Sequence, residues 1–237
     1  MPDGRSFDRF AADYDRFASL EPGSLRNWLV KQLPAHGHRA LDAGCGAGRY
    51  TQALAERFDE VVGVDISEPL IDIARRRLLD QNVRYLVADL MSITDADGFD
   101  LVFSSTTLHH LPDLNAALLH LRGLTRARGV AILIDNVASR PTPPRWVHVL
   151  GAVRNIPSDV RRLGWRQARW LMQFRTCAPW LGHLASDRYL SRGAFELQYG
   201  SVFPGGRFQN LDYAHALVWA KKNPAAVARG SEVRREP

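Results

Sequence analysis

Apolar residues along the central half of the chain follow two alternating spacings. Five short, continuous apolar runs predict buried strands, at residues 39–44, 60–67, 83–90, 99–105 and 130–137. Between them, apolar residues recur three or four positions apart and predict helices, at residues 48–58, 68–81 and 114–125. Strands that alternate with helices in this way are typical of an α/β fold, a parallel sheet covered by helices on both faces.

The two ends of the chain depart from this rhythm. Before the first strand, helical spacing recurs in two segments, residues 6–20 and 24–33. After Asn136 a proline-rich stretch interrupts the pattern. Beyond it we predict two further helices, at residues 158–175 and 191–199. Two closing strands complete the prediction, at residues 207–211 and 213–222, paired across a bend at Asp212.

The composition is that of an ordinary globular domain. The chain has 237 residues, of which 46% are apolar and 24% are charged. Its first residues lack the apolar core of a signal peptide, and no apolar run approaches the roughly 20 residues that span a bilayer. Two cysteines do not make a disulfide framework. These features favour a reducing, cytoplasmic location.

The positive charge is concentrated in one segment. The net charge is +6 overall, but residues 140–192 carry +8 and the remainder −2. This segment has ten arginines, four of the six tryptophans and two acids, Asp159 and Asp187. On the predicted helix, an exposed arginine stripe is expected at Arg162, Arg166 and Arg169.

Several interpretations of this basic, aromatic segment stay open. It could be a helical lid that buries its tryptophans over a site and leaves its arginines in solvent. It could be a membrane-surface helix that delivers a lipid or quinone-like acceptor. An acidic carrier protein that presents a tethered acceptor would also suit the charge. Nucleic acid is disfavoured, because the charge is confined to a short insertion.

A dense glycine loop follows the first predicted strand, in the sequence ALDAGCGAGRY at residues 40–50. Its glycines, Gly44, Gly46 and Gly48, have the spacing G-x-G-x-G. The dinucleotide fingerprint requires G-x-G-x-x-G, and a P-loop requires a Lys followed by Ser or Thr, so neither motif is present. The loop nevertheless lies where open parallel sheets bind ligands, outside the carboxyl ends of the strands.

Acidic residues end the next two predicted strands. Asp65 lies 19 residues after Gly46, where a carboxylate can accept hydrogen bonds from both hydroxyls of a ribose. Asp89 could face an adenine amino group, with Ile66 and Leu90 on the two faces of the ring. Asp89 could also be a simple turn residue at the end of its strand.

Four motifs in order carry a resemblance to a known family: LDAGCGAGRYTQAL, VVGVDIS, YLVADL and FDLVFSSTTLHHLPD. Together they resemble the class I S-adenosylmethionine (SAM) dependent methyltransferases, over about residues 7–136. The resemblance implies a Rossmann-like, seven-stranded, mostly parallel sheet sandwiched by helices, whose last strand runs antiparallel. It also implies a single domain over residues 1–237, with N-terminal lid helices at 1–34 and a helical cap at 138–190 before the last two strands.

The resemblance further implies SAM as the cofactor. The glycines would lie along its methionine part, Asp65 would take the ribose, and Tyr14 would fold over the sulfonium. Tyr14 could instead only pack on the sheet, and Asp42 more simply orients the loop. The expected cofactor-binding residues are Tyr14, Ala43, Gly44, Cys45, Gly46, Gly48, Asp65, Ile66, Asp89, Leu90 and Ser104.

Three residues are candidates for catalysis. Methyl transfer is a direct displacement, and a base contributes roughly 10²–10⁴ when the acceptor must lose a proton. His109 and His110 follow the fourth strand, and Asp135 ends the fifth. Alternatively a histidine contacts the cofactor and Asp135 caps the next segment. A metal site is not expected, because the histidines lack a supporting pair of acids at ligand spacing.

The sequence therefore predicts a SAM-dependent methyltransferase. Its acceptor would be a small apolar or aromatic metabolite, methylated at O, N or C, as in natural product biosynthesis. A lipid, quinone or RNA acceptor is the alternative among enzymes, and a SAM-binding protein that does not methylate is the alternative outside them. The sequence specifies neither the acceptor nor the oligomeric state.

Overall fold

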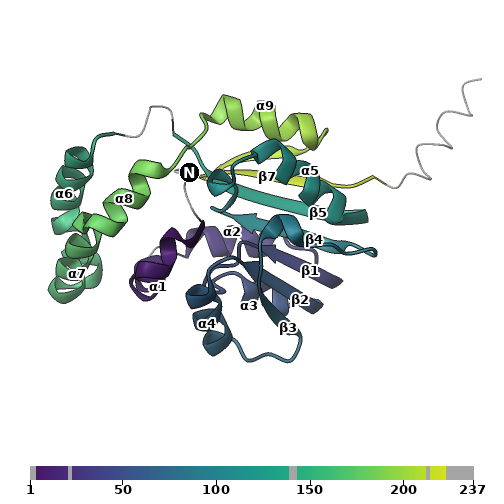
Figure 1. Ribbon diagram of the computed structural model, residues 1–237, viewed down its shortest axis with the longest axis horizontal. Coiled ribbons are helices and arrows are strands. Elements are labelled where there is room, and N and C mark those ends of the chain that lie inside the picture. The colour runs from purple at the N-terminus through teal and green to yellow at the C-terminus, as the bar shows by residue number, and fades with distance from the viewer. Residues whose placement is uncertain (1–3, 21–22, 139–142, 212–213, 223–237) are drawn as a thin grey trace, which may run out of the picture.

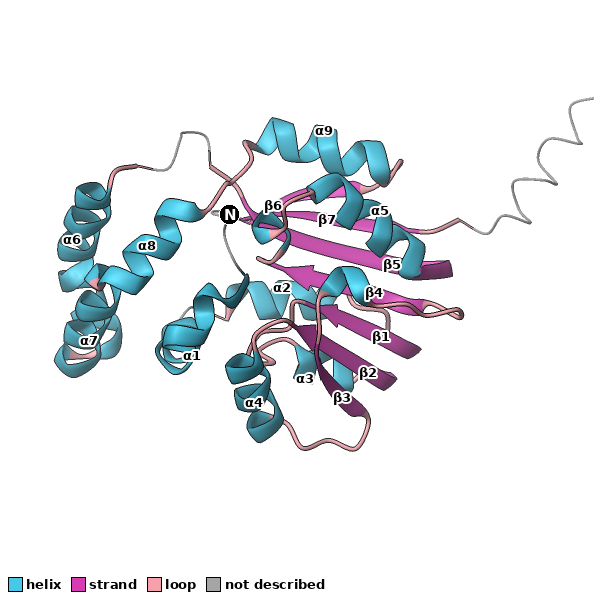
Figure 2. Ribbon diagram, viewed as in Figure 1, coloured by secondary structure: helices cyan, strands magenta, loops and turns pink. Residues whose placement is uncertain are grey.

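A seven-stranded sheet forms the centre of the protein in the computed structural model (Figures 1 and 2). The structure describes residues 4–20, 23–138, 143–211 and 214–222. The strand order is β3-β2-β1-β4-β5-β7-β6, and β7 runs antiparallel to both of its neighbours. The strands are β1 (Gly37–Ala43), β2 (Phe58–Asp65), β3 (Val83–Val87), β4 (Phe99–Ser105), β5 (Thr125–Asn136), β6 (Arg207–Leu211) and β7 (Ala214–Ala220). The predicted fold class is confirmed.

Helices cover both faces of this sheet and one end of it. The α-helices are α1 (Ala11–Ser19), α2 (Ser24–Gln32), α3 (Thr51–Ala55), α4 (Glu68–Arg77), α5 (Leu114–Leu124), α6 (Arg145–Leu163), α7 (Trp165–Thr176), α8 (Ala178–Ser186) and α9 (Arg192–Val202). Within the described ranges, the 3₁₀ helices are η1 (Gly4–Phe10), η2 (Leu90–Ser92) and η3 (Leu108–His110).

Alternate residues of the central strands feed two hydrophobic cores. In β1, Leu41 packs in the core that includes α5 and α9, whereas Ala40 packs in the core that includes α2 and α3. Successive side chains of a strand point to opposite faces, so these cores lie on opposite sides of the sheet. The last four residues of β1 are all buried, as expected of a parallel strand covered on both faces.

The cap differs from the prediction in its helices. The single helix expected at 158–175 is wrong, because Gly164 takes a φ of +79° and separates α6 from α7. The predicted arginine stripe is therefore split between two helices. Arg162 donates instead to the carbonyl oxygen of Leu20, at 2.8 Å. Helix α8 was not predicted, and the bend expected at Asp212 lies outside the described residues.

Smaller differences concern element boundaries. Helix α3 begins only at Thr51, because the glycine turn runs through the preceding residues, and β2 already begins at Phe58. Strand β5 begins five residues earlier than expected. Ser191 caps α9 as predicted, accepting the backbone N–H of Ala194 at 3.2 Å.

The N-terminal segment and the cap helices pack together beyond the carboxyl ends of the central parallel strands (Figures 1 and 2). The ring of Phe17 in α1 lies 5.0 Å from Phe174 in α7 and 5.2 Å from Trp180 in α8. The guanidinium of Arg16 lies 4.0 Å above the ring of Trp170. We call η1, α1, α7 and α8 the cover. None of the helices in the described ranges is long and apolar enough to span a bilayer.

An ion-pair network secures the opposite end of the sheet. At the start of β1, Arg39 donates to Glu60 at 2.9 Å and to both carboxylate oxygens of Asp95 at 2.9 Å. The hydrogen bonds from Arg39 lower the pKa of Asp95 below its ordinary value. A carboxyl group whose pKa is lower in the folded state stabilises the fold above its ordinary pKa, and this contribution disappears as the pH falls through the folded value.

We therefore expect Asp95→Asn to destabilise the protein near neutral pH. The difference in unfolding free energy between wild type and variant should shrink as the pH falls below the ordinary carboxyl pKa. Urea unfolding of both proteins across this range measures it. A difference that stays constant down to acid pH would contradict the assignment.

Candidate active site

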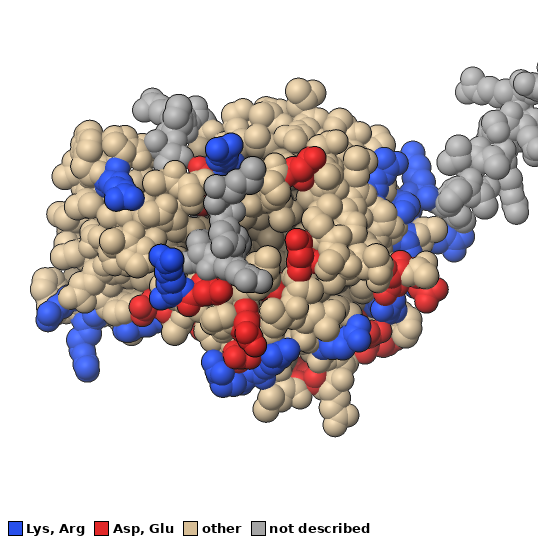
Figure 3. Space-filling model, in the orientation of Figure 1, with Lys and Arg blue, Asp and Glu red and all other residues tan. Residues whose placement is uncertain are grey.

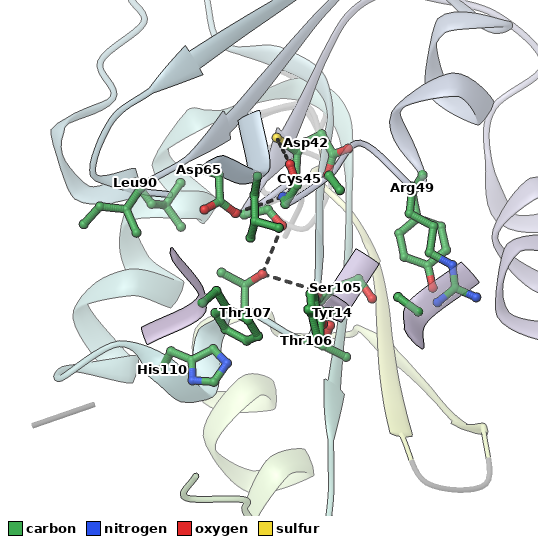
Figure 4. A pocket seen from close by; sticks show the side chains of 18 of the residues that line it. Tyr14, Asp42, Cys45, Arg49, Asp65, Leu90, Ser105, Thr106, Thr107 and His110 are labelled. Atoms are coloured by element: carbon green, nitrogen blue, oxygen red, sulfur yellow. Dashed lines mark hydrogen bonds between the residues drawn. The ribbon is translucent and has the colours of Figure 1, made fainter. Parts of the chain in front are cut away.

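A cavity of about 560 Å³ lies between the carboxyl ends of the strands and the cover. Its walls come from the glycine turn after β1, the ends of β2 and β4, and residues of η1, α1 and α8. Figure 4 shows Asp65, Cys45 and Leu90 together on one side and Thr107 and His110 on another. Segments that are distant in the sequence thus line one cavity.

The three loop glycines all have positive φ angles but face different surroundings. A Cβ atom at Gly44 would lie 2.2 Å from the side chain of Thr107. At Gly48 it would lie 2.7 Å from the hydroxyl of Tyr85. At Gly46 its nearest neighbour would be Leu70 Cδ1, at 4.0 Å. Gly46 lines the cavity, so its bare backbone leaves room for a ligand to approach closely.

Asp65 links the glycine turn to the end of β2. Its Oδ2 accepts the backbone N–H of Gly46, and its Oδ1 accepts that of Ser67, both at 2.9 Å. Burial raises the pKa of this carboxyl group, while the hydrogen bonds from the backbone lower it. Each oxygen accepts one backbone bond and can accept another from a ligand.

A second acid, Asp42, lies beneath the turn. It is buried and accepts the hydroxyl of Thr51 at 2.7 Å. Burial raises its pKa to about 7, although the Thr51 hydrogen bond lowers it. This hydrogen bond ties the end of β1 to the start of α3, and Asp42 also lines the cavity. Its role in orienting the loop stays a prediction.

Most of the expected cofactor residues line this cavity. They are Tyr14, Gly44, Cys45, Gly46, Asp65, Ile66, Asp89 and Leu90. Burial raises the pKa of the Tyr14 hydroxyl to about 12, so it is un-ionised. Asp89 also accepts the N–H of Met91 at 2.9 Å, which is the turn role considered for it.

Three other expected cofactor residues, Ala43, Gly48 and Ser104, are outside the lining of the cavity. Ser104 is fully buried and donates to the carbonyl oxygen of Ala43 at 2.8 Å, which ties β4 to β1. Gly48 faces Tyr85 rather than the cavity. These residues support the glycine turn on the side that faces away from the cavity.

The last residue of β4 and the turn after it supply three cavity residues that the sequence did not indicate: Ser105, Thr106 and Thr107. Thr106 has a φ of +53°, a strained conformation for a residue with a branched Cβ. The hydroxyl of Thr107 lies 3.2 Å from the carbonyl oxygen of Gly44 (Figure 4). The strained turn therefore lies directly against the glycine turn and braces it.

The two candidate histidines occupy different places. His110 lines the main cavity, whereas His109 and Asp135 line an adjoining cavity of about 340 Å³ that His110 also borders. His109 Nδ1 lies 2.5 Å from Asp135 Oδ1, and its backbone N–H donates to Asp135 Oδ2 at 3.0 Å. Asp135 thus fixes the position of His109 and does not face the main cavity.

The pKa values of these two rings are shifted in opposite directions. Burial lowers the pKa of His109, but the carboxylate of Asp135 offsets it and the pKa is raised overall. Burial and the neighbouring histidines lower the pKa of His110 to about 2. His110 is therefore a neutral imidazole at physiological pH.

The cap adds residues that sequence reasoning missed. Trp180, Leu184 and Tyr189 line the main cavity. Next to His110, the buried carboxylate of Asp187 lies 3.7 Å from both His110 Nδ1 and His183 Nε2. A signal was present in the sequence, because Asp187 is one of two acids in an arginine-rich segment and follows His183 by four residues.

Comparisons with known proteins agree with this geometry. Residues 41–133 match the family described as Methyltransferase domain. Over 126 residues the chain is 36% identical to malonyl-[acyl-carrier protein] O-methyltransferase of Salmonella typhimurium, covering 53% of this chain and 49% of that protein. Over 113 residues it is 34% identical to ubiquinone biosynthesis O-methyltransferase of Coxiella burnetii, covering 46% and 48% respectively.

Residues 41–133 thus carry a methyltransferase domain, and the fold is that of the class I SAM-dependent methyltransferases. The chain spans about half the length of the curated relatives that it matches. Among solved structures, its fold is similar to the DhpI–SAH complex, with a TM-score of 0.60, 17% identity and coverage of 93% of this chain and 96% of that one. It is also similar to a Haemonchus contortus phosphoethanolamine N-methyltransferase 2, with a TM-score of 0.66, 15% identity and coverage of 94% and 61%.

The cavity suits SAM, the cofactor of this family. The backbone at Gly46 is open to a close approach, and Asp65 presents a partly buried carboxylate beside it. Ile66 and Leu90 add apolar surface from the ends of β2 and β3. We propose that these four residues hold the cofactor.

The glycine turn offers a matched pair of substitutions. Gly46→Ala and Gly44→Ala both place a side chain on a left-handed backbone, which costs about 1–2 kcal/mol. Gly46→Ala should also fill cofactor space and weaken binding of S-adenosylhomocysteine (SAH) by roughly tenfold or more. Gly44→Ala should mainly lower the melting temperature, because its Cβ meets Thr107. Calorimetry and thermal unfolding measure both; SAH affinity of the Gly46 variant equal to that of wild type would overturn the assignment of Gly46.

Asp65→Asn should weaken SAH binding by about 1.5–3 kcal/mol, because hydrogen bonds to a charged acceptor are lost. Asp59→Asn, at the far end of the same strand, is the matched control and should bind SAH normally. Isothermal titration calorimetry measures both affinities. Normal binding by the Asp65 variant would remove it from the cofactor site.

Proposed function

We propose that this protein transfers a methyl group from SAM to an oxygen atom of a small acceptor with an apolar or aromatic body. The observation that carries the proposal is that one cavity has both a polar wall, suited to a cofactor, and an aromatic wall, suited to an acceptor. One end has the glycine turn and Asp65, and the other has Phe7, Phe17 and Trp180 of the cover. A bound cofactor and an apolar acceptor would thus share one enclosed space.

The residues of the cavity would act mainly by positioning. SAM supplies a methyl group on a sulfonium, which a nucleophile displaces directly. The aromatic cover would exclude water and hold the acceptor in line, and positioning of this kind is worth about 7–11 kcal/mol. We place the reacting atom of the acceptor beside His110, which lines this cavity and borders the adjoining one. Asp135 is a positioning residue, since it holds His109 behind His110.

The names of similar proteins support oxygen as the acceptor atom. Both relatives described above are named as O-methyltransferases, and one acts on malonyl-[acyl-carrier protein]. A carrier-tethered acceptor is therefore a second candidate. It is favoured by the exposed arginines of α6 and α7, among them Arg154, Arg161 and Arg166. Figure 3 shows basic side chains along the lower edge of the cap and acidic ones between the cap and the sheet. Either acceptor is consistent with a role in the biosynthesis of a small natural product.

Transfer of labelled methyl groups tests the proposed function. The protein is incubated with methyl-labelled SAM and a cell extract divided into small molecules, proteins and nucleic acids. Label in a small apolar product, or on a carrier protein and released from it by mild base, supports the proposal. Label that ribonuclease destroys would point to an RNA acceptor. Tight SAM binding without release of SAH from any fraction would contradict methyl transfer.

Trp180→Leu should impair use of the acceptor but not cofactor binding. Loss of the indole surface removes about 1.5–3 kcal/mol of apolar contact, which lowers kcat/KM for the acceptor by roughly 10–100-fold. Trp165→Leu is the matched control, because Trp165 is 67% exposed at the start of α7. Steady-state kinetics with the acceptor found above, together with SAH calorimetry, separates the two effects. A Trp180 variant with unchanged kinetics would place the acceptor elsewhere.

A further inference from the structure

Three histidines and an acid gather where the cap meets the ends of the central strands. The rings of His109 and His110 are 3.9 Å apart, and those of His110 and His183 are 5.2 Å apart. Asp187 lies among them and is 4% exposed. One ligand atom from each of His109, His110 and Asp187 falls within 4.8 Å of the other two. Imidazole and carboxylate groups together form the usual ligand set of divalent transition metals.

The surroundings of this cluster resemble a metal site in a second respect. A metal-bound histidine usually donates its other ring N–H to a carboxylate, which fixes the orientation of the ring. His109 does so through Nδ1 to Asp135, at 2.5 Å, and its Nε2 is the nitrogen left for a metal. Asp187 is held in turn by the hydroxyl of Tyr189, which donates to its Oδ2 at 2.5 Å.

The distances are compatible with one ion after small side-chain movements. Two ligand atoms about 2.0–2.2 Å from a tetrahedral metal lie roughly 3.3–3.6 Å apart. His110 Nδ1 and Asp187 Oδ1 are 3.7 Å apart, which is close to this separation. The ligand atoms of the three residues lie at most 4.8 Å apart, so each pair must approach by at most about 1.5 Å. Rotation about the side-chain χ angles can provide such a movement.

We propose that His109, His110 and Asp187 bind one divalent first-row transition-metal ion such as Zn²⁺. His183 lies beside this group but outside it, with its Nε2 3.7 Å from Asp187 Oδ2. This proposal differs from the expectation from the sequence, which found no acids at ligand spacing. The acid comes from 77 residues further along the chain, brought in by the cap.

The site lies at the boundary between the two cavities, because His110 lines both. An ion here would be positioned to polarise an acceptor oxygen and favour its ionised form. This consequence rests on the proposed function, whereas metal binding itself does not. The alternative is that Asp187 merely contacts the neighbouring histidines and fastens the cap to the body of the protein.

Cobalt titration of tag-free, chelator-treated protein tests the proposal. Histidine-ligated Co²⁺ absorbs in the visible range, and the same titration by calorimetry gives the stoichiometry. The chain also has an exposed group, in which His36 and His38 both contact Asp59. A double variant, His36→Gln with His38→Gln, removes this source of surface binding and is the matched control.

Wild type and the surface variant should each bind one equivalent of Co²⁺, displaced by Zn²⁺. Asp187→Asn and His110→Gln should lose binding, and Asp135→Asn should weaken it by roughly 10–100-fold. Two ligand variants are used because the test needs only one of them to fold. Circular dichroism verifies that each variant is folded. Equal Co²⁺ affinity for wild type and either ligand variant, or loss of binding only in the surface variant, would overturn the site. SAH binding is measured on the same samples, so failure of the metal site is distinguished from failure of the cofactor site.

Discussion

The left-handed glycine turn after β1 is the constraint on which the site depends. The N–H groups of Gly44 and Cys45 both donate to the carbonyl oxygen of Val64, at 2.8 and 3.0 Å, and that of Gly46 donates to Asp65. The turn is thus fastened to the end of β2 and not only to itself. Thr107 braces it from β4, so three adjacent strands fix one stretch of backbone. This rigidity allows bare backbone to line a cavity without collapsing into it.

The central sheet and this turn were predictable from the sequence because their signals are local. Buried parallel strands are short apolar runs, and the turn requires glycine where φ is positive, which only a few residue types tolerate. The positions of Gly46, Asp65 and Leu90 around one cavity follow from the order of strands ending at the same edge. Ser104 was placed at the correct strand end, but its hydroxyl is used within the sheet, which strand position alone does not reveal.

The helices and contacts of the cover were less predictable, because they depend on tertiary contacts. Gly164 breaks an otherwise continuous helical pattern, and its positive φ cannot be read from apolar spacing. The arginines of the cap are not all solvated either. Arg175 lies 2.5 Å from the buried carboxylate of Asp159, so part of the positive charge that appeared to mark a binding surface holds α6 and α7 together. The approach of Asp187 to His110 likewise depends on how the cap folds back over the sheet.

The central claim is that one cavity holds the cofactor against the glycine turn and opens toward the aromatic cover. A crystal structure with SAH bound tests it most directly. The account predicts ribose hydroxyls within hydrogen-bond distance of Asp65, the methionine part along Gly46, and the sulfur facing the space between Trp180 and His110. SAH bound in the reverse orientation, or in the smaller cavity beside Asp135, would contradict it.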